Sequence, residues 1–149
     1  LEVINHPIWK YQFGVYTKNK FVTSHYHIIY VCKKGFKPKF YRNARFKPSQ
    51  RDKNGKSLQY KDLEDVWEIK KEYWHGHRKT ANKLPKELVA KMIAYSSKKG
   101  DLVLDPFLGS AQVAVVAKLM NRRFVGFEKS RKAFLFASKR LRENKYLVR

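Results

Sequence analysis

The residues best suited to chemistry lie in one stretch near the carboxyl end of the chain, LVLDPFLGSAQVAVVAKLMNRRFVGFE, residues 102–128. Asp105 follows an apolar run, a turn with Gly109 and Ser110 comes next, and Glu128 ends a second apolar run. A strand, a glycine turn and a helix together present free backbone N–H groups and a positive helix end to a ligand. An acid that ends the next strand can accept hydrogen bonds from ribose hydroxyls. The spacing therefore predicts a site for a nucleoside-bearing ligand.

Asp105 indicates which charge that ligand carries next to it. The stretch has no G-x-G-x-x-G fingerprint, and a carboxylate at the strand end would repel a pyrophosphate. The same carboxylate suits a cationic group, such as an amino group or a sulfonium. A glycine turn alone is common in α/β proteins for packing reasons. The prediction therefore depends on the whole set of turn, strand-end acid and following acid.

The sequence also predicts the elements that must position these residues. Pro85 can open a helix that keeps one apolar face through about Ser96 and ends at Gly100. A strand at 102–104, a buried helix at 111–120 and a short strand in RFVGFE follow. A basic helix at 131–143 closes the chain, with Phe134, Ala137 and Leu141 on one face. Upstream, β-rich runs are expected at 13–17 and 26–32, the second apolar enough for a strand buried on both faces.

The charge balance indicates a polyanionic partner. The 149 residues include 34 Lys and Arg against 12 Asp and Glu, a formal net charge of +22. This exceeds what solubility requires, and nucleic acid is the simplest partner. Between residues 33 and 61 cations alternate with aromatic side chains, which suits phosphates and a distorted duplex. Two prolines and two glycines in this range forbid a long helix, so an extended or irregular segment is expected that regains order near residue 62. The candidate DNA-binding residues are Lys37, Lys39, Arg42, Arg45 and Lys47. The alternative is a solvated loop whose cations only raise solubility.

The stretch GDLVLDPFLGSAQVAVVAKLMNRRFVGFEKS resembles the cofactor-binding motif of amino-group DNA methyltransferases, in which D-P-F-x-G-S-G-T binds S-adenosylmethionine. The preceding KTANKLPKELVAKMIAYSS is similar to the segment before that motif in the permuted subgroup called β. The resemblance implies an α/β, Rossmann-like methyltransferase fold, incomplete here, with a basic target-recognition insertion. It divides the chain into late strands of the catalytic half at 1–33, the insertion at 34–66 and the cofactor-binding region at 67–149.

The resemblance also implies roles for single residues. Asp105 would meet the methionine amino group, Phe107 would line the cofactor, and Gly109 and Ser110 would form the turn beneath it. Glu128 would hold the ribose. The residues assigned to the carboxylate end and its loop are Asn82, Lys83 and Pro85. One departure is visible: GSAQ stands in place of GSGT, and the methyl of Ala111 would crowd the pocket mouth if that position needs a positive φ.

The family's catalytic loop, [DNS]-P-P-[YFW], does not occur in this sequence. The chain has five prolines, and none is next to another. In the permuted order that loop precedes residue 1, so a missing amino-terminal part or a second polypeptide is expected to carry it, and this chain alone is not expected to methylate. Without the loop, adenine-N6 and cytosine-N4 chemistry cannot be separated. The resemblance implies DNA methylation of the restriction–modification kind, whereas the sequence does not separate restriction protection from regulation.

Two other function classes stay open. The chain could be a nucleic-acid-binding module that keeps the methyltransferase fold without cofactor function, or a basic RNA-binding protein. No metal site is predicted: His75 and His77 lack accompanying ligands, and the acids at 62–65 are expected to cap or neutralise the insertion. Cys32 is expected to be a buried thiol. With no apolar run near the roughly 20 residues of a membrane span, a soluble, cytoplasmic protein is expected.

Overall fold

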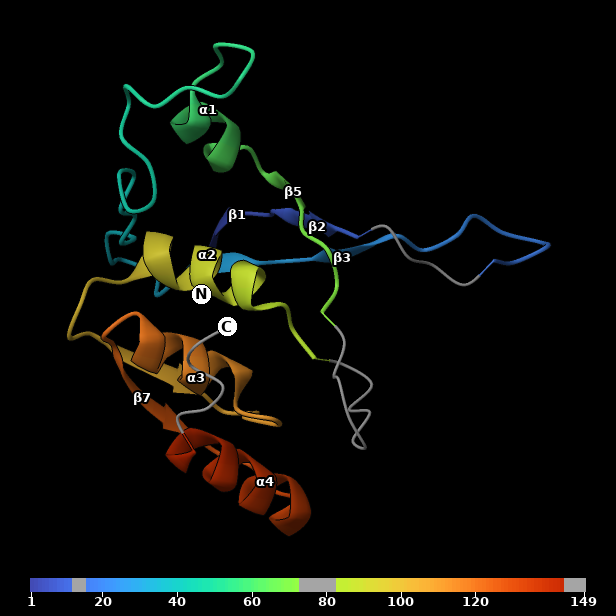
Figure 1. The fold of residues 1–149 in the computed structure, drawn as a ribbon, viewed down its shortest axis with the longest axis vertical. Helices are drawn as coiled ribbons and strands as arrows, with labels where there is room; N and C mark the ends of the chain where they lie inside the picture. Colours follow the sequence, from blue (N-terminus) through green and yellow to red (C-terminus); the bar gives the residue numbers. More distant parts are fainter. Residues whose placement is uncertain (12–15, 73–82, 144–149) are drawn as a thin grey trace. The chain divides into compact units, whose positions relative to one another are not determined.

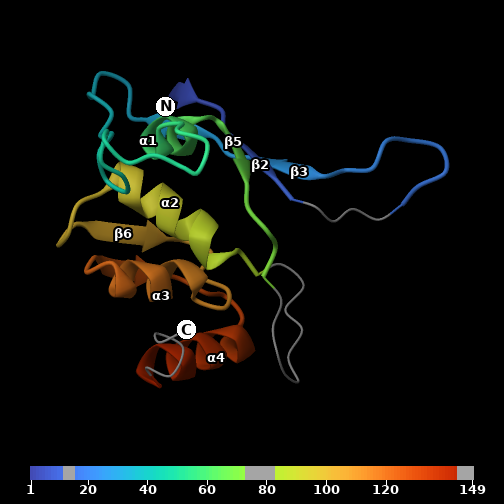
Figure 2. The same cartoon turned by 45° about the horizontal axis from the view of Figure 1, so that its top comes forward.

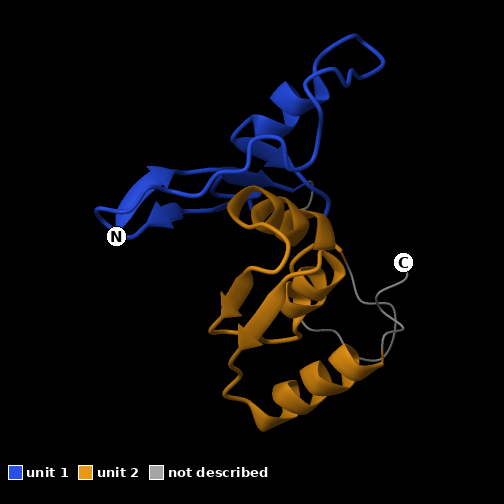
Figure 3. Ribbon diagram, turned by 90° about the vertical axis from the view of Figure 1, so that its left-hand side faces the viewer, with its two compact units in different colours: residues 1–71 blue, residues 72–149 orange. Residues whose placement is uncertain are grey.

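The computed structural model describes residues 1–11, 16–72 and 83–143, and it divides into two compact units. One unit comprises Leu1–Lys71 and the other Glu72–Arg149 (Figure 3). Each unit has its own strands and helices. The three-part division predicted from the sequence stays a prediction. The boundary between the two compact units lies after residue 71.

The first unit is built on short strands. Strand β1 (Glu2–Asn5) pairs antiparallel with β4 (Tyr30–Cys32). Strand β2 (Ile8–Lys10) lies between antiparallel β3 (His25–His27) and parallel β5 (Val66–Glu68) (Figure 1). The core of this sheet is aromatic. Trp9 and Tyr11 are buried, and the ring of Tyr26 stacks on Trp9 with centroids 5.4 Å apart.

The prediction of one strand at 26–32, buried on both faces, is wrong. The segment forms β3 and β4, which pair with different strands, and Ile29 between them is 51% exposed. The cause lies in the opposite strand, where Pro7 has no N–H to donate and interrupts the ladder. Its carbonyl still accepts the N–H of Ile28 at 2.9 Å. The other predicted strand is not seen either: residues 12–15 are outside the described part, and Tyr16 and Thr17 are not in a strand.

The basic insertion is irregular, as predicted, up to α1 (Leu58–Leu63). That helix begins a few residues earlier than the sequence suggested because the side chain of Ser57 caps it, accepting the N–H of Tyr60. A turn before it is closed by Asp52, whose carboxylate accepts the N–H groups of Lys56 and Asn54 at 2.9 Å each. These backbone hydrogen bonds hold the pKa of Asp52 below its usual value.

The second unit contains the predicted strand–helix–strand arrangement. Strand β6 (Leu102–Asp105) pairs parallel with β7 (Arg123–Gly126), and α3 (Gln112–Leu119) connects them. Helix α2 (Lys86–Ser96) precedes this strand–helix–strand arrangement in the chain, and α4 (Arg131–Arg142) follows it. Figure 2 shows α2, α3 and α4 one after another, with β6 beside α2. The described residues contain no helix that is both long and apolar enough to cross a membrane.

Helix α3 lies in the core of the second unit. Its Val116 and Ala117 pack on Val89 and Ile93 of α2, and Ala114 packs on Ala137 of α4. This explains why the helix is apolar on nearly every side, as the sequence indicated. Ala137 and Leu141 of α4 do face this core, whereas Phe134, predicted on the same face, is 48% exposed.

The end of α2 was predicted too late. The helix ends at Ser96, and Gly100 instead occupies the turn before β6 with φ +85°. Ser97 ends the helix because both its N–H and its hydroxyl donate to the carbonyl of Ile93. Helix α3 ends at Leu119, and Asn121, two residues later, is left-handed with φ +59°. The guanidinium of Arg122 joins the two ends, donating to the carbonyls of Met120 and Ser97 at 2.6 and 2.7 Å.

Candidate functional site

The turn after β6 is tied to the strand beside it. The Asp105 carboxylate accepts the N–H of Phe107 at 3.0 Å, which orders the first residues of the turn. Phe127, just after β7, accepts the N–H of Leu108 at 2.8 Å and donates its own N–H to the Asp105 carbonyl at 3.0 Å. Leu108 is buried against Gly126, where a Cβ would come within 2.6 Å of the leucine side chain. A side chain at position 126 would therefore have to displace Leu108.

Glu128 connects the turn to the start of α4. One carboxylate oxygen accepts the N–H of Gly109 at 2.9 Å, and the other accepts the N–H of Ser130 at 2.7 Å. Gly109 adopts φ +53°, which favours glycine. Because β6 and β7 are parallel, their carboxyl ends meet at one edge, and Asp105 and Glu128 both lie there. The structure thus brings together two acids, a glycine turn and the beginning of α3.

The GSAQ departure has a defined conformation. Ala111 has φ +63° and is the N-cap of α3, so this position does take the left-handed conformation. Its methyl is fully buried in a cluster with Leu108, Ala114 and Ala137. The alanine therefore costs free energy only through its left-handed backbone conformation. Its methyl group lies in the core and not at an open pocket mouth.

Two residues at the turn have a role that sequence reasoning missed. Arg140 of α4 is only 4% exposed, and its guanidinium donates to the carbonyl of Ser110 at 2.7 Å and to the Gln112 side-chain oxygen at 2.6 Å. Gln112 is likewise buried at 4% exposure. In the sequence Arg140 is one of several cations in a basic helix, and no pattern distinguishes it from the others.

The remaining residues assigned to the cofactor are divided between the turn and the segment just before α2. Phe107 is 88% exposed next to the turn. Lys83 forms an ion pair with Glu72 at 2.9 Å, and Glu72 also accepts the N–H of Lys86 at 2.7 Å. Pro85 is buried and is the N-cap of α2. Asn82 lies outside the described residues. Glu72 was not singled out from the sequence, because no sequence pattern links this acid to the helix that begins at Lys86.

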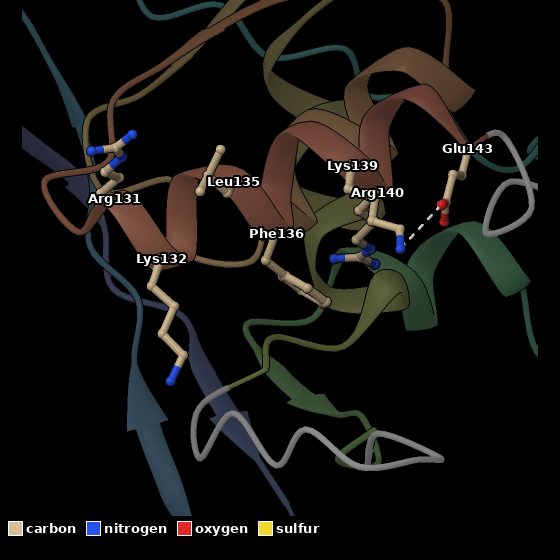
Figure 4. A pocket seen from close by; sticks show the side chains of 7 residues that line it. All are labelled: Arg131, Lys132, Leu135, Phe136, Lys139, Arg140 and Glu143. Carbon is tan, nitrogen blue, oxygen red and sulfur yellow. Dashed lines mark ion pairs between the residues drawn. The ribbon is translucent and has the colours of Figure 1, made fainter.

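A separate depression of about 760 Å3 lies along α4 (Figure 4). Its lining residues all belong to this helix or its C-cap: Arg131, Lys132, Leu135, Phe136, Lys139, Arg140 and Glu143. Cations outnumber the single acid, which pairs with Lys139 at 3.6 Å. The depression does not include Asp105 or Glu128, so the candidate site rests on the strand-end geometry.

The predicted DNA-contacting cations divide into two groups. Lys37, Lys39, Arg42 and Lys47 are exposed. Arg45 is instead held within the insertion by an ion pair with Asp62 at 3.2 Å, with side chains 19% and 15% exposed. This pairing confirms that an acid of the 62–65 cluster neutralises the insertion.

The remaining candidate metal ligands are histidine, cysteine and acidic side chains. Within the described ranges, no group of three His, Cys, Asp or Glu side chains could hold a metal ion, and His75 and His77 lie outside them. His25 and His27 lie on β3 and His6 just after β1, and ring nitrogens of His6 and His27 are 2.9 Å apart. Cys32, expected to be buried, is only half-buried, because β4 pairs with β1 alone.

Two parallel strands joined by a helix, with a glycine turn and an acid at or just after each strand end, form a strand–helix–strand unit of the α/β class, a type of unit that often binds nucleoside-bearing ligands. The particular family follows from comparison with known proteins. The family described as N6_N4_Mtase, DNA methylase, matches residues 1–139. The chain belongs to this family.

Individual relatives agree. The chain is 40% identical over 85 residues to the type II methyltransferase M2.DpnII of Streptococcus pneumoniae, covering 54% of this chain and 31% of the relative. It is 30% identical over 131 residues to M.BamHI of Bacillus amyloliquefaciens, covering 78% of this chain and 31% of the relative. The chain therefore spans about a third of the length of these curated relatives.

Solved structures show the same fold. The structure of the M1.HpyAVI–SAM complex matches with a TM-score of 0.64 and 25% identity, covering 93% of this chain and 61% of that one. The cytosine-N4-specific PvuII DNA methyltransferase matches with a TM-score of 0.76 and 15% identity, covering 97% and 52%. The predicted Rossmann-like α/β methyltransferase fold is confirmed, and this chain contains part of it.

Proposed function

We propose that this chain is the cofactor-binding and DNA-contacting part of a DNA methyltransferase that transfers a methyl group from S-adenosylmethionine to an exocyclic amino group of adenine or cytosine. The observation that carries the proposal is the placement of Asp105 and Glu128 at adjacent strand ends on either side of the glycine turn. The membership in the N6/N4 family and the similarity to a SAM-bound methyltransferase support it.

The residues at this edge fit the proposed cofactor. Each oxygen of Glu128 uses one acceptor position for a backbone N–H, and a carboxylate has about four such positions. Glu128 thus retains capacity for ribose hydroxyls while it orders the turn. Asp105 supplies a negative charge for an amino group, and its hydrogen bond to Phe107 fixes where that charge lies. When bound, the cofactor would supply an electrophilic methyl, and the role of this chain is to hold and orient it.

The catalytic loop is proposed to come from another part of the protein or from a second polypeptide. The structure offers a surface for such a part. Leu102 and Leu104 of β6 and Val125 of β7 are 55%, 60% and 42% exposed, on the face opposite the α2–α3 core. Parallel strands are normally covered on both faces. A further layer of the enzyme would bury this apolar face, so that both faces of the two parallel strands would be covered.

Duplex DNA is the proposed substrate, and the exposed cations of the insertion are proposed to contact its phosphates. Phosphate contacts provide affinity without choosing a sequence, so these residues do not define the recognition site. The competing function is a nucleic-acid-binding module that has kept the fold and lost the cofactor. GSAQ in place of GSGT is the observation that favours it.

Replacing Asp105 by Asn tests the proposal. Asn keeps an oxygen for the N–H of Phe107 but removes the charge, so we expect S-adenosylmethionine to bind about 10- to 100-fold more weakly with little change in the melting temperature of the free chain. Asp105→Ala should also loosen the turn. The measurement is the increase in melting temperature on adding S-adenosylmethionine, since a ligand that binds only the folded state raises it.

A matched control lies at the other end of the same strand. Asp101→Asn removes the same charge, just before β6, where Asp101 accepts the N–H of Lys98 at 3.1 Å. It should leave cofactor affinity unchanged. Equal losses in the two variants would mean that only the general charge matters. A parent chain whose melting temperature does not respond to S-adenosylmethionine would favour the DNA-binding module.

A further inference from the structure

A buried cation joins α4 to the proposed cofactor turn. Arg140 donates to the Ser110 carbonyl, which belongs to the turn, and to the side chain of Gln112, the first residue of α3. These two contacts lie on either side of Ala111, the residue with φ +63°. Arg140 therefore binds both ends of the segment in which the backbone has its least favourable conformation.

The energetics make this contact specific. A guanidinium at 4% exposure is costly to bury unless its N–H groups find acceptors. Because Arg only donates, Gln112 must present its oxygen to it. The amide NH2 of Gln112 is then left without a hydrogen-bond partner among the residues that the structure describes. The orientation of Gln112 is thus set by Arg140, at the expense of its own NH2 group.

The side chain at position 112 determines whether the second of these hydrogen bonds, from Arg140 to residue 112, can form. The oxygen of Gln lies two bonds further from Cβ than the hydroxyl of a Thr would, and it meets Arg140 at 2.6 Å. A Thr here would leave that guanidinium N–H without this acceptor. The Gln of GSAQ and the Arg of α4 consequently form one matched pair.

We propose that Arg140 is a positioning residue that holds the 109–112 turn in its binding conformation through Ser110 and Gln112, and that Gln112 and Arg140 compensate for the departure from GSGT. This inference rests on the proposed function, because it assigns the turn to S-adenosylmethionine. Arg140 itself is not proposed to touch the cofactor.

The experiment compares two readouts in the full chain. The first is amide hydrogen exchange in the absence of any ligand at Gly109 and Ala111, whose N–H groups bond to Glu128 and to the Leu108 carbonyl. The second is the dissociation constant for S-adenosylmethionine. Arg140→Met should speed exchange at these two amides by about tenfold or more, and weaken cofactor binding by a similar factor. Amides of α2 and β6 should be unaffected.

Two variants at position 112 separate positioning from general packing. Gln112→Thr should reproduce the loss seen in Arg140→Met, and the double variant should be no worse than either single one. Gln112→Glu should retain parental exchange and affinity, because the carboxylate still accepts from Arg140 and the unpartnered NH2 is gone. If Arg140→Met does not fold, these two variants still decide the matter.

Lys139→Met is the control for the change of residue type. Lys139 is the neighbouring residue on α4, with a side chain 72% exposed, and its replacement should change neither readout. Unchanged exchange at Gly109 and Ala111 in folded Arg140→Met and Gln112→Thr would overturn the proposal. Should the parental chain not bind S-adenosylmethionine, the proposed function fails, while the exchange readout still tests the positioning role.

Discussion

At the scale of single residues, the turn contains two left-handed positions, Gly109 and Ala111, whose surroundings differ. Gly109 has φ +53° and no neighbour closer than 3.8 Å to where a Cβ would lie. Ala111 has φ +63° and a methyl that is fully buried. A left-handed L-residue costs roughly 1–2 kcal/mol, and burying one methyl group returns about 0.8 kcal/mol. At Ala111 the burial of the methyl group therefore offsets part of the strain, whereas at Gly109 nothing would offset it.

Exchanging the residue types at these positions tests the balance. Ala111→Gly should change the free energy of unfolding by less than about 1 kcal/mol, while Gly109→Ala should lower it by about 1–2 kcal/mol. Urea denaturation monitored by tryptophan fluorescence and by circular dichroism measures both. A loss for Ala111→Gly as large as that for Gly109→Ala would show that methyl packing outweighs backbone strain here.

The residues of this turn differ in how visible they were in the sequence. Asp105 and Glu128 could be predicted to meet, because the ends of adjacent parallel strands lie at one edge. Arg140 could not be predicted, because its contact depends on how α4 packs on α3. The two partners are 30 and 28 residues away along the chain, at Ser110 and Gln112.

At the scale of elements, α2, β6, α3, β7 and α4 were predictable because each combines an apolar pattern with a local start or stop. The strands of the first unit were not, since Pro7 acts on a partner strand that is remote in sequence. The insertion was correctly predicted to be irregular. Its internal ties, such as the buried Gln59 that donates to the Asn43 side chain at 2.6 Å, depend on side-chain packing that a pattern of types does not show.

The exposed cations of the insertion should account for a defined part of the salt dependence of DNA binding. Replacing Lys37, Lys39 and Arg42 together by Ala should reduce the slope of log K against log salt by about 2 to 3, since each phosphate contact contributes about 0.9. The measurement is a fluorescence-anisotropy titration of a short duplex at several salt concentrations.

The matched control changes the same number and type of cations elsewhere. Lys98, Lys99 and Arg123 are exposed and lie at the opposite end of β6 and β7 from the turn. Their replacement by Ala should leave the slope nearly unchanged. Equal effects of the two triple variants would mean that overall charge, and not the insertion, drives binding. Arg45→Ala should instead lower stability, because it removes the largely buried ion pair with Asp62.

At the scale of the whole chain, the most informative feature is the uncovered face of the β6–β7 sheet. One face packs on α2 and α3 through Val103 and Phe124, while Leu104 and Val125 point to the other side and are exposed. Sequence patterns identified these strands as apolar without telling which face the chain itself would cover. The covered face depends on how α2 and α3 pack against the sheet, which residue types along a strand do not show.

Replacing Leu104 and Val125 by Thr should therefore be tolerated by the chain. Thr suits a strand, so we expect less self-association and less binding of a hydrophobic dye, with little change in melting temperature. Sedimentation velocity and thermal unfolding measure the two effects. Val103→Thr, on the covered face, is the comparison and should destabilise clearly; equal destabilisation on both faces would contradict the assignment of an uncovered face.

The double attachment of Glu128 has a consequence for the thermodynamics of binding. Its two oxygens already fix the turn at Gly109 and the start of α4 at Ser130 in the ligand-free chain. A nucleoside that arrives at this edge does not have to order that backbone, so the entropic cost of ordering has been met during folding. Affinity at this edge would then depend on the rigidity of the free protein as much as on the contacts made with the ligand.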